Sequence, residues 1–206
     1  MTPEGRTALV RRGLWLNYAT IGYNTFEAVL SVIAGLIASS VSLIGFGFDS
    51  AIEVTAAIAA QWRLRADLHR EARERAERIT RRIIGVTFLA LAAYVTYDSA
   101  RSLWLREKPE KTWFGLVILV LSATIMPLLA RSKRGVAIAL GSRALEADAK
   151  QTSLCAYLSI IALIGVALNS FLCLWWTDPA AALIMVPIIA NEGVANLRGE
   201  ADCETC

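Results

Sequence analysis

The sequence has little charge and a single histidine. Its charged residues make up 19% of 206 residues, against about a quarter in a typical soluble domain, which argues against a soluble globular protein. The histidine, His69, lies in a run of arginine and glutamate, where we expect a solvated side chain, and a histidine-rich metal-sensing loop is absent. A nucleophile–base pair and a phosphate-binding loop are also lacking, so we do not expect an enzyme.

Cysteine is also scarce, with four residues in the chain. Cys203 and Cys206 have the spacing C-x-x-C near the end of the sequence. A closed structural zinc site needs four ligands, and no second pair accompanies these two. We therefore expect a loose, reduced tail there rather than a zinc site within one chain.

What the sequence does contain is long apolar runs, and hydrophobic residues make up 56% of it. About 20 apolar residues in a helix cross the hydrocarbon core of a bilayer, and the backbone there must satisfy its own hydrogen bonds. Six runs are long enough: 14–38, 40–62, 83–105, 113–130, 145–172 and 175–197. They predict an all-α membrane protein, a single domain of six transmembrane helices. Asp178 and Pro179 suit the first turn of the last helix.

Positive charge is concentrated on one side of this predicted topology. Arginine and lysine lie before the first run, between the second and third, between the fourth and fifth, and after the sixth, namely at positions 6, 11, 12, 63–82, 131, 133, 134, 143 and 198. The positive-inside rule then places both termini in the cytoplasm, with segment 198–206 as a short tail. We expect 64–82 to continue the second helix before turning, and 132–134 to begin a cytoplasmic turn. Because these charges flank the spans, nucleic-acid binding is not expected.

Two acids interrupt the second apolar run. Asp49 and Glu53 are four residues apart, so a helix places both carboxylates on one face. Carboxylates at membrane depth are costly unless a partner neutralises them. No lysine or arginine lies in the first two apolar stretches, which favours a divalent cation as that partner. A water-filled groove and pairing with an arginine of another helix are the alternatives.

The first and fifth runs carry further polar groups. Asp148, Gln151, Thr152 and Cys155 follow helical spacing and share one face of the fifth run. A polar cap at the membrane interface would explain the first residues of this run, such as Glu146 and Lys150, but Cys155 lies deeper in the membrane. In the first run, Asn24 and Glu27 stand among apolar residues. Glu27 is either a third acid on an ion path or a protonated group bonded to another helix.

These motifs together resemble the cation diffusion facilitators, membrane exporters of zinc and similar divalent metals. The resemblance covers the whole membrane domain and rests on short segments in the family's order: Asn24 and Gly35, Ser40-Val41-Ser42-Leu43, Asp49-Ser50-Ala51-Ile52-Glu53, Tyr97-Asp98-Ser99-Ala100-Arg101, Ala147-Asp148, and Asp178-Pro179-Ala180-Ala181. Glu53 replaces the family's second Asp. The family's fifth span supplies His-x-x-x-Asp, where this chain has Gln151 and Cys155. The usual C-terminal metal-binding domain does not follow the sixth span, which is similar to a short branch of the family.

The resemblance implies a divalent metal transporter, with Zn²⁺ as its bound ion, protons as counter-ions and a homodimer formed through the membrane helices. Asp49 and Glu53 would supply hard oxygen ligands and Cys155 a soft thiolate, with Gln151 or Asp148 completing the site. No cofactor beyond the transported ion is expected, and we expect a bacterial inner-membrane location. The alternatives are a membrane protein that binds metal to regulate a partner, and a carrier of an organic cation.

Overall fold

The computed structural model describes the backbone of residues 3–65, 70–141 and 143–198, and their side chains except at 3–6, 60, 62–65, 70–81 and 143–144. The predictions made for His69, Cys203 and Cys206 fall outside the described residues. The described residues form six helices: α1 Pro3–Ala38, α2 Val41–Arg65, α3 Arg70–Leu105, α4 Trp113–Leu140, α5 Arg143–Leu172 and α6 Thr177–Arg198.

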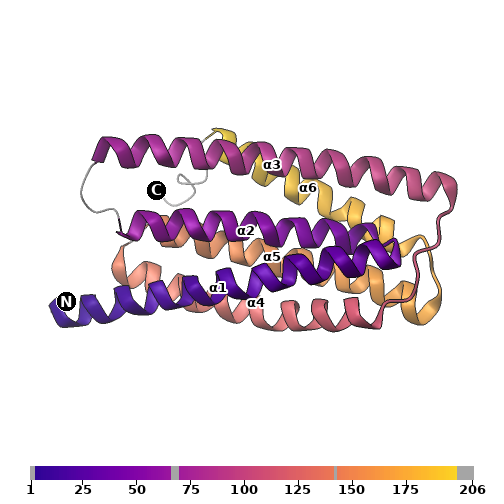
Figure 1. The fold of residues 1–206 in the computed structure, drawn as a ribbon, viewed down its shortest axis with the longest axis horizontal. Coiled ribbons are helices and arrows are strands. Elements are labelled where there is room, and N and C mark those ends of the chain that lie inside the picture. The colour runs from indigo at the N-terminus through magenta and orange to yellow at the C-terminus, as the bar shows by residue number, and fades with distance from the viewer. Residues whose placement is uncertain (1–2, 66–69, 142, 199–206) are drawn as a thin grey trace.

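All six helices are long and apolar enough to cross a membrane. They run roughly along one direction, and the start of α1 lies at the same end of the bundle as the end of α6 (Figure 1). The predicted all-α class with six transmembrane helices is confirmed. Termini at one end agree with an even number of spans, as the arginine distribution also requires.

Two helix boundaries differ from the prediction. α2 ends at Arg65, and residues 70–82 belong to α3, which begins at Arg70, so the expected continuation of α2 through segment 64–82 is wrong. The turn expected at 132–134 is wrong, because α4 continues to Leu140. At 1.5 Å per residue this 28-residue helix is about 42 Å long, so its last turns extend beyond about 30 Å of hydrocarbon into the interface.

The bundle consists of four mutually packed helices and one further pair. α1, α2, α4 and α5 pack around a common interior, while α3 lies chiefly along α6 (Figure 1). The α1–α2 contact is close because two glycines lie in it. A Cβ at Gly35 would stand 2.9 Å from the Ile44 nitrogen, and one at Gly47 would stand 3.0 Å from that of Val32. Such small residues let membrane helices approach closely.

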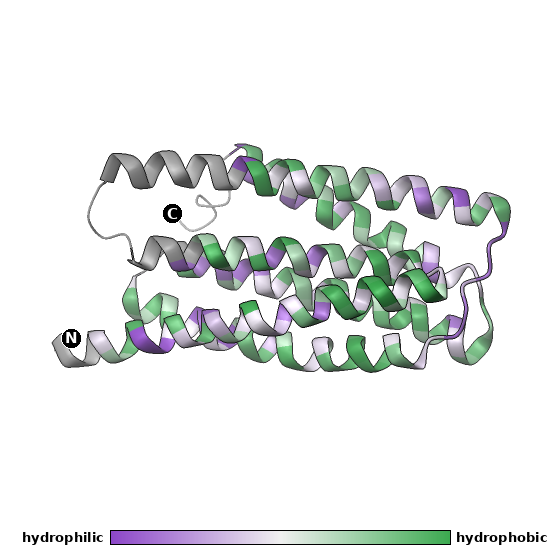
Figure 2. Ribbon diagram, in the orientation of Figure 1, coloured by the Kyte–Doolittle hydropathy of each residue, from purple (hydrophilic) through white to green (hydrophobic). Residues whose placement is uncertain are grey.

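Apolar side chains face outward as well as inward. Figure 2 shows hydrophobic residues along the length of all six helices. Large ones are exposed on the outside, including Phe26 at 73%, Ile37 at 72% and Trp104 at 87%. In water such a surface would associate, whereas in a bilayer it contacts lipid. The polar groups are therefore left to the interior and to the two ends.

The start of α2 is held by a carboxylate from α6. Asp178 is fully buried and accepts hydrogen bonds from the Ser40 hydroxyl at 2.6 Å, the Val41 N–H at 2.9 Å and the Ser42 hydroxyl. Ser40 also caps α2, because its oxygen accepts from the Leu43 N–H at 3.3 Å. The sequence predicted only that Asp178 would favour its own helix, but here it also fixes the first turn of α2 against α6.

We expect Asp178→Ala to destabilise the fold by roughly 3 kcal/mol, because it leaves buried hydroxyl and N–H donors without an acceptor. Helix content followed by circular dichroism during unfolding in detergent measures this. Asp98→Ala is the control, since Asp98 is partly exposed and its nearest ion-pair contact is 4.0 Å away at Arg101. Equal unfolding midpoints for the two variants would contradict the assigned role.

The orientation can be tested with a native cysteine. Cys173 is exposed in the link between α5 and α6, at the end of the bundle opposite the start of α1, whereas Cys155 is buried. An impermeant maleimide added outside intact cells should label Cys173, and Cys173→Ser should abolish the labelling. Labelling that persists in Cys173→Ser and is lost in the double variant Cys203→Ser/Cys206→Ser would show the opposite orientation.

Candidate cation site

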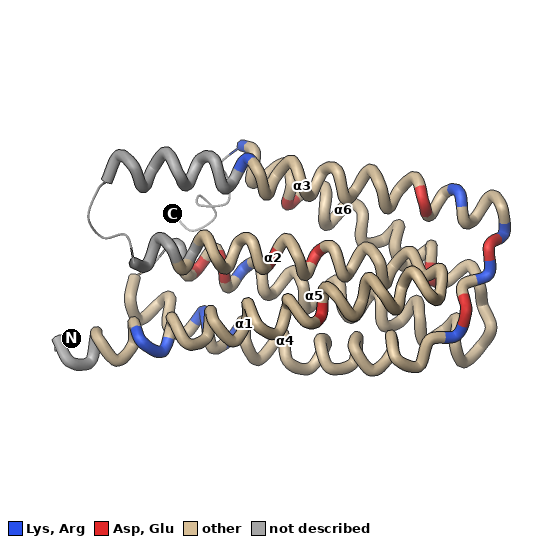
Figure 3. The backbone as a smooth tube through the Cα atoms, viewed as in Figure 1, with Lys and Arg blue, Asp and Glu red and all other residues tan. Residues whose placement is uncertain are grey.

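The interior between α1, α2, α4 and α5 is polar. Figure 3 shows acidic segments midway along α1 and α2, while most lysines and arginines lie toward the ends of the bundle. The buried polar side chains come from all four helices: Asn17, Thr20, Asn24, Glu27 and Ser31 from α1; Asp49, Ser50 and Glu53 from α2; Ser122 and Lys133 from α4; and Asp148, Gln151, Thr152 and Cys155 from α5. The α1 residues recur every three or four positions, as one inward stripe requires.

Asp49 and Glu53 are both buried on the inner face of α2, at 1% and 0% exposure. None of their four carboxylate oxygens meets a donor in hydrogen-bonding geometry, although Cys155 lies close to both acids and Thr152 close to Glu53. Among the described residues neither carboxylate forms an ion pair within 4.0 Å with a lysine or arginine, so the arginine-paired alternative is not seen. Buried acids without donors are costly, and a native site that tolerates them needs a reason.

Glu27 and Cys155 join these acids from the two neighbouring helices. The Ser50 hydroxyl donates to Glu27 Oε2 at 2.8 Å, and Cys155 Sγ lies 4.0 Å from both the same oxygen and the Ser50 hydroxyl. Glu27 Oε1 has no partner. The Cys155 thiol also lies within electrostatic reach of Asp49 and Glu53. Three carboxylates and one thiol therefore gather where α1, α2 and α5 meet.

The remaining predicted residues are less well placed. Asp148 is buried, but its carboxylate lies 2.8 Å from Lys133 Nζ in an ion pair. Gln151 is buried on the inner face of α5 with no hydrogen bond among the described residues. Asn24 is buried on α1, and neither atom of its amide has a partner. Asp49, Glu53 and Cys155 thus lie together, and Asp148 is bound elsewhere.

The acids and the thiol do not form a finished coordination shell. Within the described residues no group of three or more histidine, cysteine, aspartate or glutamate side chains is close enough to hold a metal ion together. The candidate ligand atoms come from three helices, but they do not converge on a single metal position. Small shifts of those helices would be needed to close it.

Sequence reasoning missed Lys133, which it assigned to a cytoplasmic turn. In the structure Lys133 is fully buried within α4. A signal was available: Ser122, Met126, Ala130 and Lys133 follow helical spacing and share the inner face. This spacing was overlooked because Arg131 and Arg134 flank Lys133, and a run of charged residues usually marks the end of a membrane span.

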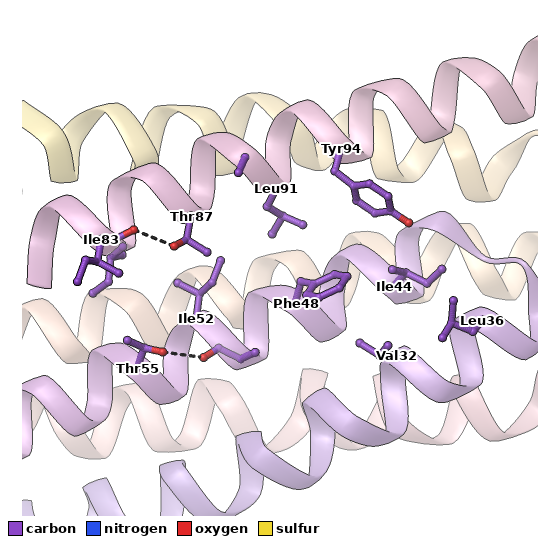
Figure 4. Close-up of a pocket in the computed structure, with 13 residues that line it drawn as sticks. Val32, Leu36, Ile44, Phe48, Ile52, Thr55, Ile83, Thr87, Leu91 and Tyr94 are labelled. Atoms are coloured by element: carbon purple, nitrogen blue, oxygen red, sulfur yellow. Dashed lines mark hydrogen bonds between the residues drawn. The ribbon is translucent and has the colours of Figure 1, made fainter.

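A groove of about 540 Å³ lies on the other side of α2, away from the acids. Figure 4 shows residues of α1, α2 and α3 lining it, among them Val32, Phe48 and Leu91. Thr55 and Thr87 donate to carbonyls of their own helices, at 3.2 and 2.8 Å. The groove therefore presents apolar surface and is not the place for a cation.

The described residues therefore form six membrane-length helices with buried acids in their interior. Residues 18–200 match the model of the cation efflux transmembrane domain, and the chain belongs to this family. The predicted resemblance is confirmed, and the protein is an integral multi-pass membrane protein of a transporter family rather than of an enzyme family.

Two curated relatives are similar over most of the chain. Transmembrane protein 163 of Xenopus laevis is 24% identical over 189 residues, which cover 89% of this chain and 66% of the relative. Protein p34 of Rickettsia prowazekii (strain Madrid E) is 23% identical over 176 residues, which cover 82% of this chain and 58% of the relative. The chain thus spans less than two-thirds of the length of either relative.

Proposed function

We propose that the protein transports a divalent metal cation, Zn²⁺, out of the cytoplasm. The observation that supports this best is the pair Asp49 and Glu53, fully buried with four carboxylate oxygens that no donor satisfies. A cation passing between the helices would supply the missing partner, and membrane-buried acids commonly mark ion pathways. Membership of the cation efflux family points the same way.

The ligand chemistry favours zinc among divalent metals. Asp49, Glu53 and Glu27 offer hard oxygens, whereas Cys155 offers sulfur, which calcium and magnesium avoid and zinc accepts. Gln151 lies one turn from Cys155 on the same face and could provide a fourth ligand once the helices close. Zinc accepts both cysteine sulfur and carboxylate oxygen and usually takes four ligands.

Charge balance supports exchange with protons. Asp49, Glu53 and Glu27 carry up to three negative charges against two positive charges on the metal. Because metal ligands must lose their protons to bind, protons compete with the ion for the same atoms. We propose proton–metal antiport by alternating access, in which helices rock around a fixed mid-membrane site. A homodimer formed through the membrane helices and a bacterial inner-membrane location remain our predictions.

A second function is favoured by the unfinished ligand shell. A site that binds metal without releasing it across the membrane could regulate a partner protein, and no closed ligand group is present in the described residues. An organic cation is less well supported, since it needs an aromatic cage. Phe48 lies in the apolar groove and packs edge-on against Tyr94, with ring centroids 6.2 Å apart.

We expect Asp49→Asn and Glu53→Gln each to reduce zinc affinity and flux by at least about tenfold, since even outer-shell partners are worth about 10- to 100-fold in metal affinity. Calorimetry on purified protein and uptake into liposomes measure the two quantities. Stability should hold or rise, because each change removes a buried charge.

Asp98→Asn, near the membrane surface on α3, is the matched control and should retain parental flux. If both site variants bind and transport zinc like the parent, the acids are structural and the proposed function is wrong. Normal zinc binding with no flux in the parent would instead favour the regulatory function.

A further inference from the structure

Lys133 and Asp148 form a buried ion pair between α4 and α5. The ammonium nitrogen lies 2.8 Å from Asp148 Oδ2, and the two side chains are 0% and 1% exposed. Lys133 also donates to the Thr152 hydroxyl at 3.0 Å, and Thr152 donates to the Asp148 carbonyl at 3.1 Å. Among the residues whose side chains the structure describes, Lys133 is the only buried lysine or arginine.

The burial of this lysine is not explained by its position along the helix. Lys133 lies in the part of α4 that approaches the cytoplasmic interface, and its neighbours Arg131 and Arg134 are exposed there. A lysine side chain is long enough to extend to such an interface, where its ammonium group is hydrated. Burying an ion pair seldom adds stability, because desolvation offsets the attraction. A role in the polar interior accounts for the inward orientation better.

The pair lies next to the candidate cation site. Glu53 is within electrostatic reach of Lys133, Asp148 and Thr152, and Cys155 follows Thr152 along the inner face of α5. Lys133 thus lies close to a carboxylate whose two oxygens meet no donor in hydrogen-bonding geometry. The Lys133 ammonium group therefore attracts two carboxylates, those of Glu53 and Asp148.

We propose that Lys133 is a positioning residue whose positive charge is held away from Glu53 by Asp148, so that the pair sets the affinity of the site for a divalent cation. Asp148 then acts through Lys133 and is not itself a metal ligand. This inference rests on the proposed function, because it assumes that Glu53 binds the transported ion.

The two members of the pair should therefore act in opposite directions. Without Asp148, Glu53 is a carboxylate within charge-interaction range of the ammonium group, and Lys133 competes with the metal there. Without Lys133, Glu53 and Asp148 are both uncompensated, and the site attracts a divalent cation more strongly. Charge interactions at these distances change affinity on the order of tenfold.

The experiment is a double-mutant cycle on the full chain purified in detergent, with Zn²⁺ affinity measured by calorimetry. Lys133→Gln should bind Zn²⁺ about tenfold more tightly and Asp148→Asn about tenfold more weakly, by the same charge argument. The double variant should return to near the parental value. Arg134→Gln, which removes the exposed neighbouring cation, is the control and should leave the affinity unchanged.

Three results would overturn the inference. Losses of affinity in both single variants would show a purely structural pair. A double variant as weak as Asp148→Asn would make Asp148 a ligand, and unchanged affinities would make the pair irrelevant. If Lys133→Gln fails to fold, the Zn²⁺ affinities of Asp148→Asn and the double variant still test the proposal. A tighter double variant supports it, and equal affinities contradict it.

The same titrations separate this inference from the proposed function. A parent that binds Zn²⁺ and loses it in Glu53→Gln supports the function whatever the cycle shows. A parent that binds no Zn²⁺, or binds it equally well in Glu53→Gln, overturns both.

Discussion

The cost of burying carboxylates without water is the constraint on which this structure depends. The outer surface is apolar, so α1, α2, α4 and α5 turn their polar residues inward. The Asp178 carboxylate accepts three hydrogen bonds, and the Asp148 carboxylate forms an ion pair with Lys133. The carboxylates of Asp49 and Glu53 have no such geometric partner among the described residues. The fold satisfies the structural acids and leaves the candidate ligands free for a cation.

The sequence predicted the features that depend on local spacing. The number and order of the six helices follow from the apolar runs, and the shared face of Asp49 and Glu53 follows from their separation of four residues. Both required no knowledge of tertiary contacts. The position of Cys155 followed in the same way from its place on the polar stripe of α5.

The features that sequence reasoning missed depend on partners distant along the chain. Asp178 meets Ser40 across 138 positions, and Lys133 meets Thr152 across 19. Both charges stood at expected helix ends, where a surface role is the ordinary interpretation. Which of them turns inward is decided by tertiary packing, which neither hydropathy nor charge pattern encodes. The family motifs include Asp178 and Ser40 but say nothing of their contact, and Lys133 belongs to none of the matched segments.

The departure of α5 from the family pattern gives the site its particular chemistry. Where the resemblance leads one to expect histidine and aspartate, the chain has Gln151 and Cys155, and Cys155 lies 4.0 Å from Glu27 Oε2. A thiol beside two or three carboxylates is a ligand set that a spectroscopic measurement can distinguish from an all-oxygen one.

X-ray absorption spectroscopy of the zinc-loaded protein tests the account most directly. We predict a four-coordinate zinc with one sulfur at about 2.3 Å and oxygen ligands at about 2.0–2.2 Å. The sulfur contribution should disappear in Cys155→Ser, and Asp49→Asn with Glu53→Gln should abolish the bound zinc. A zinc shell that is unchanged when Cys155, Asp49 and Glu53 are replaced would contradict the claim that these residues hold the ion.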